Sequence, residues 1–234
     1  MTLVATFFPL ICWLVYGSGI RLVERRRPSL SVIMSIQRRR WVAHAVRRES
    51  PLDAILSGNL MNSVSFLAST TVLLILAIIA AFGQINVLMG SLSAVSVGPA
   101  YTTAEMQMHL VVMLAFYVLA FFAFTLSLRQ FNHFCIMLGA VDHHGAATEE
   151  EIEAIAMMNT LAAKNFNNGL RAYYFSIACV AWFAASWLAI AASLVTVVFL
   201  AHREFFSTAH RIAASATLVG MRGDVQRSPA NPSA

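Results

Sequence analysis

The sequence has little charge, and this scarcity excludes an ordinary soluble surface. Charged residues make up 12% of the 234-residue chain, whereas hydrophobic residues make up 59%. Because soluble domains carry about 25% charged residues, this chain has too few to cover a surface that faces water. The apolar residues are also gathered in long runs, and runs of about 18 or more apolar residues indicate membrane spans. We therefore expect an integral membrane protein.

Cysteine and the patterns of cofactor and catalytic sites are also scarce. The three cysteines are an odd number without metal-type spacing, which argues against a disulfide framework. One cluster of metal-capable side chains occurs, and its spacing matches no zinc signature; it comprises His133, Cys135, Asp142, His143 and His144. Nucleophile elbows, phosphate-binding glycine loops and dinucleotide fingerprints are missing. The sequence therefore predicts no catalytic residue, metal or cofactor, and an intramembrane enzyme is the weakest class of function.

Positive charge is present but concentrated in one region. Nine of the sixteen basic residues lie between Arg21 and Arg48, whereas residues 84–107 contain no arginine or lysine. Because cytoplasmic loops of membrane proteins carry an excess of basic residues, we expect the loop 21–58 to be cytoplasmic in a multi-pass protein of the inner cell membrane. Such a block is typical of contacts with anionic lipid headgroups. Nucleic acid is not an expected partner.

Four apolar runs predict an all-α bundle of about four transmembrane helices. They cover residues 3–22, 62–82, 110–128 and 172–200. The last run is longer than one span needs and short for two. We interpret it as one tilted or kinked helix, with a re-entrant hairpin near Trp182 to Trp187 as the alternative; the choice decides on which side the C-terminus lies. Residues 1–205 thus form the membrane domain, and residues 206–234 are predicted to be a polar, largely disordered tail.

One or two amphipathic helices should complete the cytoplasmic side. Pro28 ends the first helix and Ser29 can cap a second. We expect this helix to lie along the membrane, with the arginines 38–40 (Arg38, Arg39 and Arg40) on lipid headgroups and Trp41 at the acyl boundary; a solvated connector is the alternative. A capping-box spacing from Thr148 to Glu151 opens another helix.

A stripe of polar residues precedes and enters the second run. Its members, which we call the polar stripe, are Asn59, Asn62, Ser65 and Ser69. Offsets of three and four place them on one helix face. Within hydrocarbon, such a face should meet another helix, another subunit or water. The alternative is that the two asparagines lie in the headgroup zone.

Two arginines adjoin the later runs. Arg129 follows the third run, where it either snorkels to the headgroups or is an ionisable group within the bundle, and Arg171 precedes the fourth. Our first hypothesis is an oligomeric channel- or transporter-like protein, assembled through the polar stripe, in which these arginines favour anions. The second is a non-catalytic accessory or scaffold subunit, whose stripe holds another membrane subunit.

Three sequence blocks carry a resemblance to a known family. They are RRRWVAHAV at Arg38 to Val46, SLRQFN at Ser127 to Asn132 and NNGLRAYYF at Asn167 to Phe175, together with REF at Arg203 to Phe205. The chain resembles family 599 of the domains of unknown function, over nearly its whole length apart from the tail. The resemblance implies a multi-span membrane protein of the kind found in bacteria and plants, without an established activity. It directs attention to Arg40, Trp41, Asn62, Arg129, Asn132, Gly169, Arg171 and Tyr174.

Overall fold

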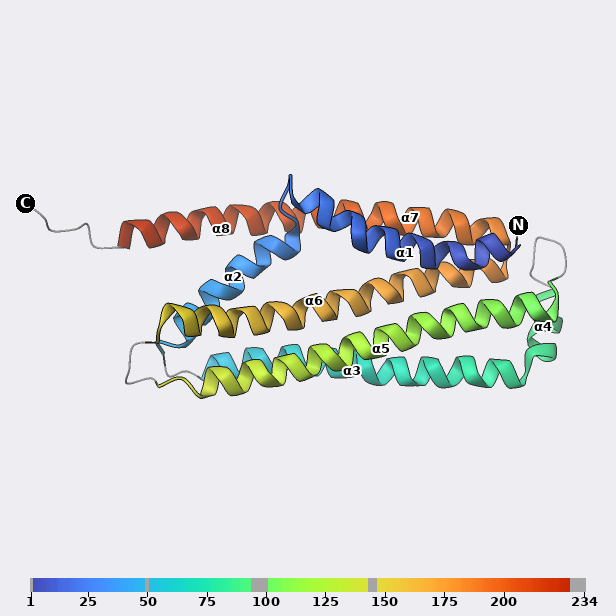
Figure 1. The fold of residues 1–234 in the computed structure, drawn as a ribbon, viewed down its shortest axis with the longest axis horizontal. Coiled ribbons are helices and arrows are strands. Elements are labelled where there is room, and N and C mark those ends of the chain that lie inside the picture. The colour runs from blue at the N-terminus through green and yellow to red at the C-terminus, as the bar shows by residue number, and fades with distance from the viewer. Residues whose placement is uncertain (1, 49–50, 94–100, 143–146, 228–234) are drawn as a thin grey trace, which may run out of the picture.

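The chain is all-helical over the residues that the computed structural model describes, which are 2–48, 51–93, 101–142 and 147–227. Its elements are α1 (Thr2–Glu24), α2 (Leu30–Ala45), α3 (Pro51–Gly83), α4 (Ile85–Ser93), α5 (Thr103–Gly139), α6 (Glu149–Val180), the 3₁₀ helix η1 (Ala181–Phe183), α7 (Ser186–Phe205) and α8 (Thr208–Arg227). Figure 1 shows an elongated bundle in which α5 lies between α3 and α6, and α1 lies along α7.

Four segments are long and apolar enough to cross a membrane. They are Thr2–Glu24, Pro51–Gly83, Thr103–Gly139 and Ser186–Gly220. Helices suit this environment because they satisfy every backbone polar group within the segment. The predicted class, an all-helical membrane protein with four apolar spans, is confirmed, and the chain is a multi-pass membrane protein.

The fourth apolar run is not one helix, so our preferred interpretation of residues 172–200 is wrong. Helix α6 ends at Val180, η1 follows, and α7 begins at Ser186. The two helices run in opposite directions along each other (Figure 1), which makes a hairpin that turns within the region we considered as the alternative. The reason is that the first part of the run is the apolar end of α6, a long helix whose other end is acidic. The run therefore joins the ends of two helices.

The predicted disordered tail from residue 206 is also wrong for most of its length. Helix α8 occupies Thr208–Arg227 and packs against α2. Gln37 Nε2 donates to Thr217 Oγ1 at 2.7 Å, and His210 Nε2 lies 3.1 Å from the carbonyl oxygen of Pro28. The stretch before Gly220 is rich in alanine, the strongest helix former, and α2 supplies the tertiary contacts. Residues 228–234 lie outside the described residues.

Aromatic side chains fill the interior where α5 and α6 pack together. Phe116, Phe124 and Phe134 of α5 and Phe175 of α6 are fully buried. Without a hydrophobic driving force in lipid, such close packing is a main source of attraction between membrane helices. The α5–α6 pair is therefore the centre from which the other helices are positioned.

Candidate functional site

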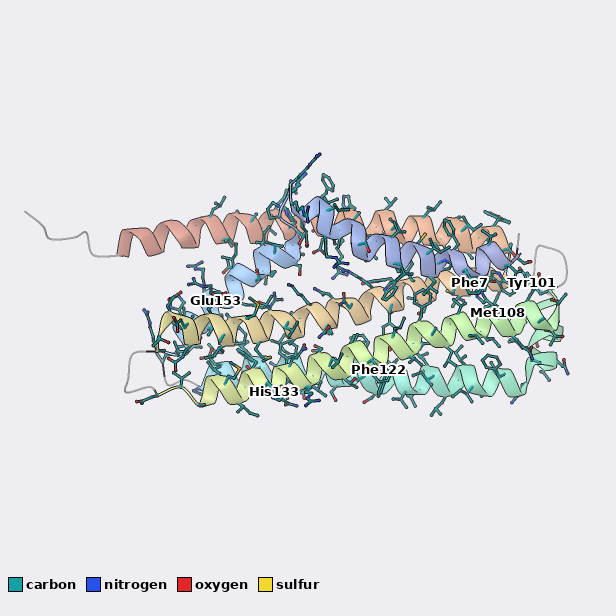
Figure 2. The ribbon with its side chains drawn as sticks, in the orientation of Figure 1. Phe7, Tyr101, Met108, Phe122, His133 and Glu153 are labelled. Atoms are coloured by element: carbon teal, nitrogen blue, oxygen red, sulfur yellow. The ribbon has the colours of Figure 1, made fainter. Side chains whose placement is uncertain are left out.

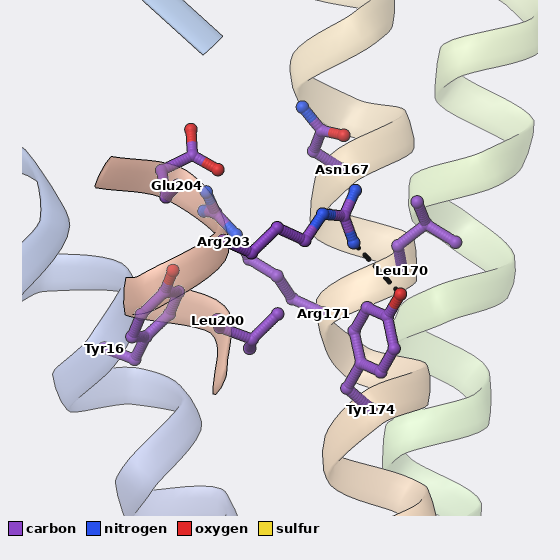
Figure 3. Close-up of a pocket in the computed structure, with 8 residues that line it drawn as sticks. All are labelled: Tyr16, Asn167, Leu170, Arg171, Tyr174, Leu200, Arg203 and Glu204. Atoms are coloured by element: carbon purple, nitrogen blue, oxygen red, sulfur yellow. Dashed lines mark hydrogen bonds between the residues drawn. The ribbon is translucent and has the colours of Figure 1, made fainter. Parts of the chain in front are cut away.

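A polar cavity lies where α1, α6 and α7 meet, and we call it the basic cavity. Its volume is small, about 20 Å³, and it is lined by Tyr16, Asn167, Leu170, Arg171, Tyr174, Leu200, Arg203 and Glu204 (Figure 3). Helical periodicity brings these residues together, since offsets of three and four place side chains on one face. The hairpin then brings the face of α6 opposite that of α7.

Two arginines in the basic cavity are held by aromatic rings. The Nη1 atom of Arg203 donates to Tyr174 Oη at 3.0 Å, and the Cζ atom of Arg203 is 5.9 Å from the centroid of that ring. The Cζ atom of Arg171 is 5.4 Å from the ring centroid of Tyr16, which is 8% exposed. Aromatic faces attract guanidinium groups electrostatically without neutralising them. The rings therefore orient both cations and leave their charge in place.

The basic cavity keeps a positive balance. In the described part of the chain, neither Arg171 nor Arg203 has a carboxylate oxygen within 4.0 Å. The single carboxylate of the lining, Glu204, accepts a hydrogen bond from the backbone N–H of Ser31 at 3.1 Å. Guanidinium groups are suited to planar carboxylates and phosphates. Two cations against one carboxylate make this cavity a candidate anion site.

Of the two arginines singled out from the sequence, only Arg171 lines the basic cavity. Arg129 is exposed on α5 and lines neither this cavity nor the other two cavities described for the chain. The second cation of the site is Arg203, which sequence reasoning did not assign a role. The one available signal was the REF block, because a hairpin near Trp182 to Trp187, which brings Arg203 to Arg171, was only the alternative interpretation of the last apolar run.

The polar stripe faces away from the rest of its own chain. All four of its side chains are exposed, whereas the buried residues of α3 lie on the opposite side and include Asp53, Val64 and Thr71. The predicted contact with another helix is therefore not made within the described residues of one chain. A contact with another subunit or with water stays a prediction.

Helix α2 packs along α6 and α8, so it is not isolated on a membrane surface. Arg39 forms ion pairs with Glu149 and Glu153 of α6, the latter at 2.8 Å. Trp41 Nε1 donates to Asp53 Oδ1 at 2.6 Å. Burial lowers the pKa of Arg38 from its usual value. The predicted headgroup contacts of α2 stay a prediction, but Arg39 and Trp41 have partners within the chain.

A buried aromatic stack at the other end of the bundle was missed by sequence reasoning. The Trp182 ring lies between Tyr101 and His109, with centroid distances of 4.1 and 4.2 Å. Tyr101 Oη donates to the Trp182 carbonyl at 2.9 Å, and Figure 2 labels Tyr101 at this end. His109 Nε2 lies 3.0 Å from the Cys179 carbonyl oxygen. The stack anchors the α6–α7 turn, and no local pattern links residues so far apart in sequence.

The cluster of metal-capable residues is only partly described. His133 is exposed on α5 (Figure 2), and Cys135 Sγ lies 3.8 Å from Met61 Sδ. His143 and His144 lie outside the described residues. Among the residues with a described position, no three His, Cys, Asp or Glu side chains are grouped as metal ligands would be. We therefore propose no metal site from these residues.

Comparison with known proteins gives one result. A family model described as "Protein of unknown function, DUF599" matches residues 4–209, which include every residue of the basic cavity. No curated protein and no solved structure matches the chain.

Proposed function

The chain belongs to the DUF599 family of membrane proteins of unknown function, and from this premise we propose that it is a channel- or transporter-like protein that binds an anion in its basic cavity. Arg171 and Arg203 attract the anion, and Tyr174 orients Arg203. The protein acts in the inner cell membrane with the loop 21–58 on the cytoplasmic side, as the distribution of arginines favours.

The depth of Arg171 is the observation that carries this proposal. Arg171 lies over Tyr16 of α1, and Tyr16 is five residues before Arg21, about 7.5 Å along the helix at 1.5 Å per residue. Arg171 therefore lies about 7.5 Å deeper in the apolar run of α1 than Arg21, the first of the arginines that close that run. Charged residues at such depth are costly, and those that persist commonly mark substrate or ion pathways.

The polar stripe supports an oligomeric form of the protein. An exposed row of asparagine and serine side chains on a spanning helix is stabilised when another subunit supplies hydrogen-bond partners. We propose that copies of the chain associate through this face of α3. The interior of a single chain is filled with aromatic rings, so a polar path would run between chains.

The same dense interior favours a second candidate, a non-catalytic accessory or scaffold subunit. In this case the polar stripe holds a different membrane protein, and the basic cavity binds an anionic group without moving it. The two candidates differ in flux and in partner, since only the first predicts anion movement by the purified protein alone.

Flux in reconstituted liposomes tests the proposal. The native protein should move small anions such as chloride or phosphate, and Arg171→Gln and Arg203→Gln should each reduce the rate at least several-fold. Arg211→Gln is the matched control, because Arg211 is exposed on α8 away from the cavity. No anion flux by the native protein would overturn the transport proposal, and a reproducible heterologous partner in mild detergent would then support the accessory function.

A further inference from the structure

A larger groove adjoins the basic cavity. It has a volume of about 730 Å³ and is lined by residues of α1, α5 and α6 and by Ser31 of α2. Asn167 and Arg171 line both hollows. Because the groove is open and the cavity is small, the groove can take a ligand that the cavity cannot.

Two walls of the groove differ in polarity, one being apolar and the other polar. The α5 wall consists of Leu119, Phe122, Ala123 and Leu126, and Figure 2 labels Phe122 midway along α5. The α6 wall is entirely polar and comprises Lys164, Asn165, Asn167, Asn168 and Arg171. Since α6 runs opposite to α1 and α5, Lys164 lies toward the end of the groove where Arg21 and Glu24 close α1 (Figure 1).

The length of the groove matches one leaflet. Its α1 wall extends from Trp13 to Glu24, about 16 Å at 1.5 Å per residue. Half of a hydrocarbon core of about 30 Å is about 15 Å. The apolar wall is also accessible, since Leu14 is 55% and Phe122 58% exposed. An acyl chain entering from the bilayer would meet this wall directly.

Small residues make the room on the α1 side. A Cβ atom on Gly17 would have no heavy atom within 4 Å apart from its own helix and chain neighbours. Gly17 lines the groove together with Ser18. The chain surface is therefore hollow at this point, where a leucine side chain would fill it.

The charged residues that line the groove favour an anionic ligand. Arg21, Lys164 and Arg171 are three cations, and Glu24 is the single carboxylate of the lining. Glu24 already accepts a hydrogen bond from Ser29 Oγ at 2.5 Å. Lysine and arginine are the usual ligands of phosphate groups.

We propose that this groove binds an anionic phospholipid, with one acyl chain against Phe122 and Gly17 and the headgroup phosphate at Lys164 and Arg171. This inference deepens the proposed function and rests on it at one residue, Arg171, which also lines the basic cavity. A zwitterionic lipid of the same chain length fits the apolar wall equally well but is held less strongly, because its ammonium group meets the three cations.

Lipid binding to the purified full chain in mild detergent tests the headgroup preference. Native mass spectrometry with phosphatidylglycerol and phosphatidylcholine of identical acyl chains should show a preference of about tenfold for the former, about 1.4 kcal/mol, because only phosphatidylcholine brings an ammonium group beside the three cations. Lys164→Gln should remove most of this preference, whereas Arg211→Gln should keep it. Equal retention of the two lipids by the native protein would overturn the proposal.

A second pair of variants tests the acyl chain. Gly17→Leu should weaken the binding of both lipids, whereas Gly19→Leu should not, because Gly19 also has open space around it but does not line the groove. Unchanged binding in Gly17→Leu, or full displacement of the lipid by an equal concentration of inorganic phosphate, would contradict a lipid ligand.

Flux measurements separate this inference from the proposed function. If Gly17→Leu loses lipid but still conducts anions, the groove is a lipid site beside a working anion site. Headgroup preference in a native protein without anion flux would retain the lipid site and reject the transport function. Anion flux by the native protein without any headgroup preference would retain the transport function and reject the lipid site.

Discussion

The ring of Phe124 lies directly against Gly169 where α5 and α6 pack together. A Cβ atom at position 169 would be 2.5 Å from Phe124 Cε1 and 2.7 Å from its Cδ1. Small residues allow membrane helices to approach closely, and here the glycine makes room for an aromatic ring. The resemblance singled out Gly169 among the NNGLRAYYF residues, and this contact supplies the physical reason.

Replacing Gly169 with alanine should destabilise the protein. Phe124 is fully buried and also packs against Phe166 and Tyr173, so the ring has little room to move, and we expect a loss of about 1–3 kcal/mol from overpacking. Thermal unfolding in detergent measures the effect. Gly58→Ala is the control, because a Cβ atom there meets nothing within 4 Å, and an equal loss in both variants would refute the explanation.

Asp53 joins the start of α3 to α2 and to the connection between them. Its carboxylate accepts from Trp41 Nε1 at 2.6 Å and from two guanidinium nitrogens of Arg48 at 2.7 and 3.0 Å. The hydrogen bond with Asp53 raises the pKa of Arg48. It also holds the connection between α2 and α3 against the start of α3. Asp53 itself is 6% exposed.

Asp53→Leu should therefore cost stability, because the indole N–H of the half-buried Trp41 loses its acceptor, a penalty of at most about 1–3 kcal/mol. Asp53→Asn is the matched variant, since its amide oxygen can still accept from Trp41, and it should lose less. Unfolding temperatures of the three proteins decide the matter, and identical values for the two variants would show that the hydrogen bond contributes nothing.

Tyr174→Phe should weaken anion binding while the protein stays folded. The substitution keeps the ring but removes the hydroxyl that accepts from Arg203, so the guanidinium is less well oriented. Tyr173→Phe is the neighbouring control, because the Tyr173 hydroxyl is bonded on the α3 side, to Thr71 Oγ1 at 2.5 Å. The half-saturating anion concentration in flux assays should rise in Tyr174→Phe alone; a rise in both would indicate a general loss of packing.

Combined Asn62→Leu and Ser65→Leu substitutions should separate the copies of the chain. They remove two of the four hydrogen-bonding side chains of the polar stripe while keeping its helix apolar enough for lipid. Ser63→Leu is the control, since adjacent residues diverge by about 100° around a helix and Ser63 is exposed to one side of the stripe. Mass determination in detergent should show a smaller particle only for the double variant, and a monomeric native protein would disprove association through this face.

Several features followed from local patterns, since they depend on neighbours in the chain. The capping box at Thr148 is present, with Glu151 N–H donating to Thr148 Oγ1 and Thr148 N–H donating to Glu151 Oε2. Ser29 caps α2, accepting from the Val32 N–H. Such signals act within one turn of helix, so the residues that produce them are read together in the sequence.

The sequence by itself determined that lipid is the solvent of this protein, because too few charges remain to cover a surface in water, and three of its long apolar runs correctly placed α1, α3 and α5. It could not decide that α6 and α7 form a hairpin, because two apolar helix ends in succession have the same composition as one long span. Only the tertiary structure joined Arg171 to Arg203 and Tyr16, and turned the polar stripe outward. Those contacts join segments that lie far apart in the chain, and the faces that meet are selected by side-chain shape, as where Phe124 packs on Gly169, which no local pattern encodes.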